Sequence, residues 1–346
     1  MFNKILGKFS RDLGIDLGTS NTLIHVKDKG IIINEPTVVA LNIKTDQVLA
    51  IGEYAKQMVG KTPPHLIVSR PLEKGIISDF EVAEKMLKYF IDKIHQESIN
   101  IIPRPRVVIG IPMDVTEVER KAVEDAALFA GAREVFLVDK AMANAIGLRI
   151  PINDPAGNMI VDLGGGLTEI SVISLGGVVN FRTLDIAGRT LDEDIINYTR
   201  DEYKVLLGES MAETAKIKIG AIYDIDSPIE MEVRGRDLTS GLPKQIILNS
   251  YNIRDALGRS IRTIIDSIKA VLEITPPALV ADIYEKGIIL TGGGAMLRGL
   301  DKLVSHEIEI PVHVAEDPLT SVVRGTAFIL EDQDLLKNIS IPSPGK

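Results

Sequence analysis

The chain has 346 residues, of which 45% are hydrophobic and 25% are charged, a composition that supports two globular domains with sizeable cores. Its net charge of −9 argues against a nucleic-acid-binding protein, because affinity for the phosphate backbone comes from clustered lysines and arginines. The absence of cysteine excludes disulfides, thiol nucleophiles and cysteine metal sites, and no apolar run approaches the roughly 18 residues that span a bilayer.

The first nine residues, MFNKILGKF, have the pattern of a short amphipathic helix. Their apolar members follow the i, i+3, i+4, i+7 spacing of one helix face, and these are Phe2, Ile5, Leu6 and Phe9. Three cations lie outside this stripe: Lys4, Lys8 and Arg11. The pattern is typical of a helix that lies in a membrane interface. A frayed terminus, or a first turn packed on the core, fits the same residues, so both interpretations stay open.

Strand-like and helix-like segments then alternate along the chain, which predicts an α/β architecture. The predicted strands are 12–17, 22–27, 31–41, 106–111, 135–138, 158–163, 169–174, 178–185, 229–234, 245–248 and 287–291. Helices are predicted at about 81–97, after Thr116 and at about 254–274. Capping boxes are expected at Ser78 with Glu81 and at Thr116 with Glu119, and helix ends at Gly131 and Pro276–Pro277. The C-terminal ISIPSPGK is expected to be a loose tail.

An internal repeat organises these segments. Aligned from Ile15 and Val161, the twelve positions to Val26 and Val172 agree at six. Each copy ends an apolar run with an acid, places a glycine two residues later and a threonine six residues later. The repeat predicts two similar lobes, each opening on a strand, an Asp–Gly turn and a second strand.

The residues of the repeated turn suit phosphate binding. A strand that ends in Asp and turns through Gly exposes backbone N–H groups in a concave nest that holds phosphate oxygens. Because carboxylates repel phosphate, Asp16 and Asp162 imply an intervening divalent cation, hydrated Mg²⁺. Short donors accompany them: Thr19, Ser20, Asn21 and Thr168. A plain β-hairpin would explain one copy, whereas two copies with matched spacing favour a phosphate clamp.

Two further patterns accompany the repeat. In GIILTGGGAMLRGL (287–300), three glycines separate an apolar strand from a helix start, where backbone can approach a nucleotide closely. Leu297 replaces the last glycine of a dinucleotide fingerprint, which excludes that motif. Glu213 and Lys216 have the i, i+3 spacing of one helix face and could bind ribose hydroxyls. A solvent-exposed ion pair is the simpler interpretation of that spacing.

Together these motifs resemble the phosphate and adenosine motifs of the actin, Hsp70 and sugar-kinase superfamily, and within it the MreB family of bacterial actins. The resemblance extends from about residue 11 to residue 330. The matching motifs are DLGTSNTLI (16–24), NEPTVVAL (34–41), RPRVVIGIP (104–112), GNMIVDLGGG (157–166), VRGRDLTSGLP (233–243), LTGGGAMLRGLD (290–301) and AEDPLT (315–320). The N-terminal amphipathic stretch is also similar to the family's, which favours the membrane interpretation.

The resemblance implies an actin-like ATPase fold, in which two lobes of duplicated ribonuclease-H-like domains form four subdomains around a nucleotide cleft. An amphipathic segment (1–10) and a tail (339–346) flank them. The implied subdomains are IA (11–39, 73–151 and 321–338), IB (40–72), IIA (152–187 and 252–320) and IIB (188–251).

The resemblance also implies a site for ATP or ADP with Mg²⁺. Asp16 and Asp162 would order the metal through water. The phosphates would be held by Gly18, Thr19, Ser20 and Asn21 from one lobe, and by Gly164, Gly165, Gly166, Leu167 and Thr168 from the other. Adenosine would be contacted by Glu213, Thr214, Ala215 and Lys216 and backed by Gly292, Gly293, Gly294, Ala295 and Met296.

Three departures from the family pattern bear on hydrolysis. Where the family reads Glu-Pro-Met-Ala, the chain begins the motif with Lys140, and the family's glutamate orients the attacking water. Leu167 replaces a hydroxyl of the family's GGGTTE, and Arg189 replaces an acid after Gly188. Compensation by Asp139 is the alternative, but a neighbouring strand residue would point the other way. The sequence therefore predicts bound ATP with impaired hydrolysis.

The function implied by the resemblance is a filament that governs cell shape, or shape and movement in wall-less cells. The expected partners are further copies of the chain, an anionic membrane surface, other MreB paralogues, and membrane shape or wall-synthesis proteins, but no nucleic acid. The expected location is cytoplasmic, peripheral at the inner face of the cell membrane. A chaperone would need a long substrate-binding region after the ATPase, and a small-molecule kinase an inserted pocket with a catalytic acid; neither is expected here.

Overall fold

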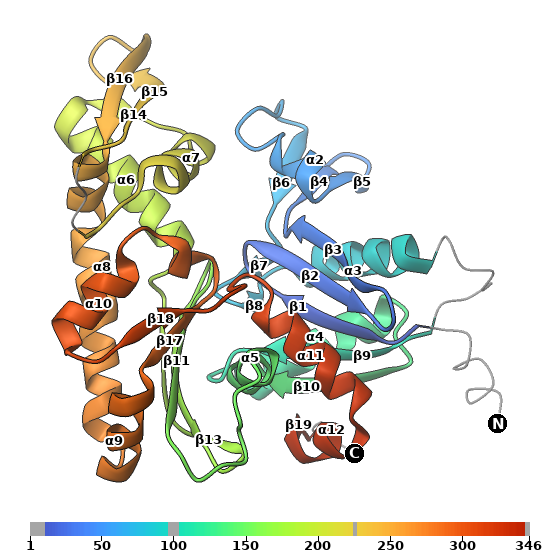
Figure 1. Ribbon diagram of the computed structural model, residues 1–346. Helices are drawn as coiled ribbons and strands as arrows, with labels where there is room; N and C mark the ends of the chain where they lie inside the picture. Colours follow the sequence, from blue (N-terminus) through green and yellow to red (C-terminus); the bar gives the residue numbers. More distant parts are fainter. Residues whose placement is uncertain (1–10, 96–103, 224–226, 343–346) are drawn as a thin grey trace. The chain divides into compact units, whose positions relative to one another are not determined.

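The computed structural model describes residues 11–95, 104–223 and 227–342 (Figure 1). The predicted membrane stripe of Phe2, Ile5, Leu6 and Phe9 lies outside these residues. The chain divides into two compact units, the first formed by Met1–Ile152 with Thr320–Lys346 and the second by Asn153–Leu319. The finer division into four subdomains stays a prediction. None of the described helices is long and apolar enough to cross a membrane.

The first unit is built on a six-stranded sheet in the order β19-β10-β9-β1-β2-β3. Its strands are β1 (Leu13–Leu17), β2 (Asn21–Val26), β3 (Gly30–Pro36), β9 (Arg106–Ile111), β10 (Glu134–Asp139) and β19 (Ser340–Ile341). Strands β1, β9 and β10 are parallel, and β1–β2–β3 is an antiparallel meander.

Helices cover both faces of this sheet. Alternate residues of β9 belong to different cores: Val107, Ile109 and Ile111 pack with one, and Val108 packs with the other. The first core contains residues of α3 (Phe80–His95) and α4 (Glu117–Phe129), and the second contains residues of α5 (Lys140–Gly147), α11 (Ser321–Glu331) and α12 (Gln333–Ile339). Burial on both faces explains why these strands read as nearly continuous apolar runs.

Helices α5 and α11 approach one another at backbone distance. A Cβ at Gly147 would collide with the carbonyl oxygen of Ser321, and a Cβ at Gly325 with that of Ala143. Only glycine allows this approach. The crossing fixes the helix that begins at Lys140.

The second unit is built on a five-stranded sheet in the order β13-β12-β11-β17-β18. Its strands are β11 (Asn158–Leu163), β12 (Thr168–Ser174), β13 (Gly177–Leu184), β17 (Ile288–Thr291) and β18 (Val312–Val314). The order repeats that of β3-β2-β1-β9-β10 in the first unit, with the same pattern of antiparallel and parallel neighbours. The sequence repeat is therefore a structural repeat.

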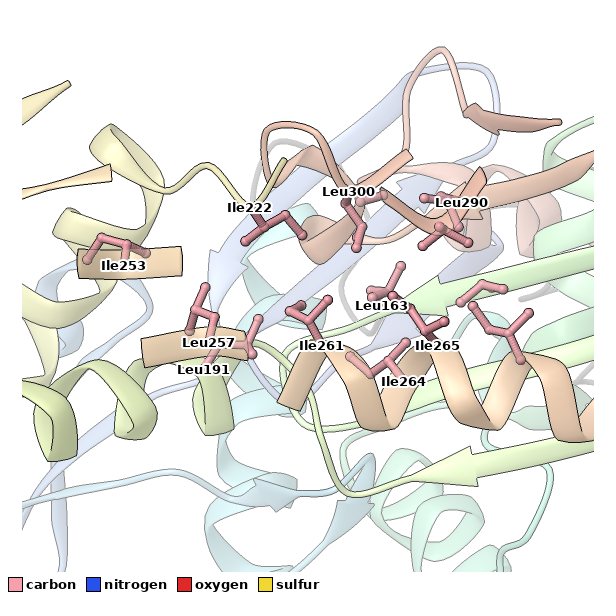
Figure 2. Close-up of a cluster of buried hydrophobic side chains, with 14 of the residues drawn as sticks. Leu163, Leu191, Ile222, Ile253, Leu257, Ile261, Ile264, Ile265, Leu290 and Leu300 are labelled. Carbon is pink, nitrogen blue, oxygen red and sulfur yellow. The ribbon is translucent and has the colours of Figure 1, made fainter. Parts of the chain in front are cut away.

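One long helix dominates the core of the second unit. Helix α8 (Ser250–Ile274) directs Ile261, Ile264 and Ile265 into a cluster that includes Leu163 at the end of β11 (Figure 2). The remaining helices of the unit are α6 (Gly188–Tyr203), α7 (Glu209–Ile219), α9 (Pro277–Lys286), the short 3₁₀ helix η1 (Gly293–Met296) and α10 (Leu300–Ile308). Because Leu163 is fixed in this core, the glycine turn that follows it has a rigid base.

Smaller elements complete both units. The first unit also contains a three-stranded sheet in the order β5-β4-β6, formed by β4 (Val39–Asn42), β5 (Gln47–Ile51) and β6 (Leu66–Ser69). The same unit contains the short helix α2 (Glu53–Lys56) and the two-stranded pair of β7 (Leu72–Glu73) and β8 (Ile76–Ile77). In the second unit, β14-β15-β16 is formed by Val205–Leu206, Glu230–Asp237 and Pro243–Asn249.

Several local predictions need correction. The single strand expected at 31–41 is two strands, β3 and β4, because the amide of Thr37 donates to the carbonyl of Ser20 instead of continuing a ladder. Asp79, and not Ser78, caps α3, since its Oδ1 accepts from the amide of Val82 at 3.1 Å. The tail was expected to be loose, yet Ser340 and Ile341 pair with β10.

Other helix boundaries agree with the sequence or extend it. The capping box of Thr116 and Glu119 is confirmed, and Gly131 follows the end of α4 with φ 114°. Helix α8 begins earlier than expected, at a capping box formed by Asn249 and Asn252. Pro277 occupies the first turn of α9, so the two prolines end one helix and begin the next.

Candidate functional site

The first Asp–Gly turn joins β1 to β2 in the first unit. Asp16 is 9% exposed and pairs with Leu23 across the hairpin. The amide of Gly18 donates to the carbonyl of Asn21 at 3.1 Å, which closes the turn. Ser20 and Asn21 are exposed at its tip. The turn therefore presents two polar side chains to solvent above a buried carboxylate.

Thr37 supports this turn from behind. Its hydroxyl donates to the carbonyl of Gly18 at 2.7 Å and lies 2.9 Å from the hydroxyl of Thr22. Thr19 is also buried, and its hydroxyl accepts from the amide of Gly75 at 2.7 Å. Thr37 was not predicted as a supporting residue, and its one signal in the sequence is a threonine between Pro36 and an apolar run.

The second turn joins β11 to β12 in the second unit with the same geometry. Asp162 is 6% exposed and pairs with Glu169, as Asp16 pairs with Leu23. The amide of Gly164 donates to the carbonyl of Leu167 at 2.9 Å. Each unit therefore has a buried acid at the end of its strand, followed by a turn closed by the same backbone contact.

The side chain of Thr168 makes a hydrogen bond within the protein. The residue is fully buried, and its hydroxyl donates to the carbonyl of Ile186 at 2.6 Å. This hydroxyl therefore already has an acceptor and holds the base of the turn. The role of Thr168 in ligand binding stays a prediction.

The second turn is fastened to the start of α6. The amides of Gly188 and Arg189 donate to the carbonyls of Gly164 and Gly165 at 3.0 and 2.9 Å. A Cβ at Gly188 would lie 3.4 Å from both Gly164 and Gly165. The residue that departs from the family pattern, Arg189, is thus fixed beside the glycine turn.

Lys216 joins the same group of residues from α7. Its ammonium donates to the carbonyl of Gly188 at 2.5 Å and lies 2.8 Å from Oδ1 of Asp192. The side chain is 15% exposed. The simple interpretation of Lys216 as part of a solvent-exposed ion pair with Glu213 is therefore wrong: its carboxylate partner is Asp192, from α6.

The other residues near Lys216 differ in what they can offer a ligand. Ala215 is fully buried in the core, and the hydroxyl of Thr214 donates to the carbonyl of Ser210 at 2.6 Å. Thr214 is partly exposed, and the contact of both residues with adenosine stays a prediction. Glu213 is partly exposed and remains a candidate.

The third glycine cluster lies at the carboxyl end of β17. Thr291 pairs with Asp162, so the glycines that follow lie beside the second turn. A Cβ at Gly292 would collide with Oδ1 of Asp162, and one at Gly294 would lie 2.7 Å from Cβ of Leu163. Packing on β11 therefore explains two of the three glycines without a nucleotide. Gly293 is the exposed one.

The two residues that follow these glycines, Ala295 and Met296, differ in burial. Ala295 is 3% exposed and belongs to the core, whereas Met296 is 60% exposed. Of these two side chains, that of Met296 is the accessible one. The expectation that both residues back adenosine stays a prediction.

Lys140 begins α5 at the carboxyl end of the first unit's sheet. A Cβ at Gly110 would lie 3.8 Å from Cα of Lys140, and Gly110 is the strand neighbour of Asp16. The structure therefore brings Lys140 and Asp16 to the same end of this sheet. Asp139 precedes Lys140 as the N-cap, without a side-chain capping bond. Burial raises the pKa of Asp139, and the charge of Arg120 partly opposes that shift.

The donor set suits a hydrated divalent cation. No group of three or more histidine or acidic residues that could enclose a metal occurs among the residues described. Each turn by itself offers one buried carboxylate, Asp16 in the first unit and Asp162 in the second. Mg²⁺ typically takes one or two carboxylates and keeps several waters.

Comparison with known proteins gives a consistent result along nearly the whole chain. The family model described as MreB/Mbl protein matches residues 10–338. The cell shape-determining protein Mbl of Bacillus subtilis is 47% identical over 328 residues, which are 95% of this chain and 98% of the relative. The cell shape-determining protein MreB of Escherichia coli is 49% identical over 341 residues, 97% of each.

Solved structures give the same picture. The crystal structure of MreB 5 of Spiroplasma citri bound to AMPPNP has a TM-score of 0.90 and 37% identity, covering 95% of this chain and 98% of that chain. A MamK double helical filament has a TM-score of 0.79 at 22% identity, covering 93% and 99%, and shows a shared fold.

Proposed function

The chain belongs to the MreB/Mbl family, and we propose that it is an ATP-binding bacterial actin that polymerises into membrane-associated filaments governing cell shape. The observation that carries this proposal is the pair of equivalent Asp–Gly turns, one in each unit. The binding of AMPPNP and ADP by MreB5 of Spiroplasma citri supports an adenine nucleotide as the ligand.

Nucleotide binding follows from the chemistry of the two turns. The backbone of Gly18–Asn21 and of Gly164–Leu167 would hold the β- and γ-phosphates, with Ser20 and Asn21 adding exposed donors. Asp16 and Asp162 would order Mg²⁺ and its waters, and the metal would neutralise phosphate charge. Met296 and Glu213 would contact the nucleoside.

Lys216 would support phosphate binding by the second turn, through where its ammonium is held and through its positive charge. Its ammonium is held between Gly188 and Asp192, directly beside the glycine turn. The carboxylate partner keeps the lysine in place but offsets part of its charge. We therefore assign it the role of fixing α7 against the turn, with its positive field adding to phosphate binding.

Hydrolysis would be slow in this chain. The attacking water needs a group that accepts its hydrogen bond and holds it in line with the γ-phosphorus. A lysine ammonium has three donors and no acceptor, so Lys140 cannot do this. Leu167 has no polar side-chain atom, so it cannot replace the hydroxyl that would hold this water. The outcome is a filament that retains ATP.

Membrane attachment would come from residues 1–9 through their apolar stripe and basic residues. The place of action would be the inner face of the cell membrane, beside other MreB paralogues and membrane shape or wall-synthesis proteins. Polymerisation would multiply a weak attachment, because a filament presents many copies at once.

Electron microscopy of the protein on anionic lipid tests the function, in three samples that contain ATP, ADP or no nucleotide. We expect filaments on the lipid with ATP, and fewer or none without nucleotide. Equal assembly in all three samples would refute nucleotide-dependent polymerisation, and the absence of filaments in every sample would refute the filament itself.

A further inference from the structure

The residues expected to contact the nucleoside come from two separate elements of the second unit. Glu213 lies on α7, and Met296 is the last residue of η1, much later along the chain. One nucleoside can contact both side chains only if the end of α7 keeps a fixed position relative to η1. The segments that follow these two elements, 220–223 and 297–299, lie side by side and form the junction between them.

Backbone contacts join the two segments of this junction. Ala221 and Arg298 form a parallel β-bridge, and the amide of Ile222 donates to the carbonyl of Arg298 at 3.0 Å. Ile222 and Leu300 belong to the buried cluster of the second unit (Figure 2). The junction is therefore anchored in the core from both segments.

The side chain of Arg298 extends this junction to the last turn of α7. Its Nη1 donates to the carbonyls of Lys218 and Gly220 at 2.9 and 3.2 Å. The last carbonyls of a helix have no partner within the helix, and the helix dipole favours a positive charge at this end. Arg298 is exposed and lies two residues after Met296. One exposed guanidinium therefore links the end of α7 to the segment that continues from η1.

We propose that Arg298 is a positioning residue for nucleoside binding. By capping α7, it holds Glu213 and Met296 at the separation that a nucleoside requires, without contacting the ligand itself. Lys216 has a different role, because it ties the same helix to Gly188 beside the second glycine turn. The inference rests on the proposed nucleotide binding, and it assigns Arg298 to the nucleoside and not to the phosphates.

Titration calorimetry of the full chain with two ligands tests this role, each in the presence of Mg²⁺. The ligands are ATP and inorganic tripolyphosphate, which offers phosphates without a nucleoside. Without the two hydrogen bonds, the end of α7 leaves its binding position for part of the time, and the apparent affinity falls by that fraction. We expect Arg298→Gln to weaken ATP binding by about three- to tenfold and to leave tripolyphosphate binding unchanged.

Two further variants accompany this one. Arg298→Lys keeps a positive charge and hydrogen-bond donors, so it should recover part of the lost ATP affinity. Arg262→Gln is the matched control, because it removes an exposed arginine from α8 in the same unit. Its affinities for both ligands should equal those of the wild type, and an equal loss of ATP affinity in this control would overturn the assignment.

Hydrogen exchange gives a second measurement that does not depend on a ligand. Exchange at the amides of Gly220 and Ile222 should be faster in Arg298→Gln than in the wild type without nucleotide, since both amides lie in the junction. Unchanged exchange, or unchanged ATP affinity, would overturn the positioning role. Equal losses for ATP and tripolyphosphate would also overturn it, because they would show an effect of charge alone. A wild type that binds neither ligand would instead overturn the proposed nucleotide site.

Discussion

Leu167 is the structural counterpart of Asn21. Each supplies the carbonyl oxygen that closes its glycine turn, accepting from Gly164 at 2.9 Å and from Gly18 at 3.1 Å respectively. The two turns therefore offer a ligand the same backbone but different side chains: an exposed amide in the first unit and a branched apolar group in the second.

The packing of Gly292 on Asp162 leads to the first prediction. Gly292 has φ 78°, and a Cβ there would collide with Oδ1 of Asp162. Because this backbone region is nearly confined to glycine, Gly292→Ala should lower the free energy of unfolding by about 1–3 kcal/mol. It should also displace the carboxylate and weaken nucleotide binding. Thermal unfolding and nucleotide titration measure the two effects.

Gly293→Ala is the matched control for that variant. A Cβ at Gly293 would meet only Cδ2 of Leu319, at an ordinary 3.4 Å. The free energy of unfolding of Gly293→Ala should stay close to that of the wild type. Equal destabilisation by the two variants would contradict the assigned role of Gly292.

The second prediction concerns the metal-ordering acid of the second turn. Asp162→Ala removes the carboxylate that would order Mg²⁺ and its waters, so nucleotide affinity in the presence of Mg²⁺ should fall by about 10- to 100-fold. Titration with and without Mg²⁺ measures the change. Asp154→Ala, at an exposed position of the same unit, is the control. Unchanged affinity and unchanged Mg²⁺ dependence in Asp162→Ala would show that the proposed clamp is misplaced.

The third prediction uses the pH dependence of stability. Burial raises the pKa of Asp139 above its usual value. A carboxyl with a higher pKa in the folded state binds its proton more tightly there. Its stabilising contribution is therefore full below the unfolded-state pKa, and it is lost as the pH rises through the folded-state pKa. Asp139→Asn should therefore raise Tm at neutral pH, and the gain should shrink as the pH falls toward about 4. A lower Tm of the variant at neutral pH would contradict this.

The fourth prediction concerns residues 1–9. Their four apolar side chains and nearby cations should attach the protein weakly to anionic vesicles, with roughly 1 kcal/mol from each basic residue. Deletion of these residues should abolish most co-sedimentation while nucleotide binding persists. Undiminished vesicle binding after the deletion would refute the membrane role of the segment.

The sequence was sufficient for the fold class because local signals agreed with the long-range arrangement. The α/β actin-like fold and the family are confirmed by the comparisons, and the repeat at Ile15 and Val161 matches a repeated strand order. The missed strands were short or exposed. β5 has three exposed residues in succession, and β19 exists only because Ser340 and Ile341 meet β10, roughly 200 positions away along the chain.

The candidate site was predictable in its turns and less so in its side chains. Sequence spacing located both Asp–Gly turns. It could not show which threonine hydroxyls form hydrogen bonds within the protein, because their acceptors lie in distant segments of the chain. Thr168 donates to Ile186, and Thr37 supports Gly18 from another part of the chain. The pairing of Lys216 with Asp192 likewise joins two helices whose relation no local pattern encodes. The catalytic and binding roles of these residues stay predictions.

The most direct test of the account follows phosphate release and pelletable polymer in the same ATP sample, for the wild type, Lys140→Glu, Leu167→Thr and the double variant. Losing groups that position a reacting water typically costs on the order of 10²-fold in rate. We expect wild-type polymer to form with phosphate release well below that of a family member that carries the glutamate. The double variant should gain more than either single variant alone, since both changes act on one water. A wild type that already releases phosphate as fast as such a family member would contradict the account.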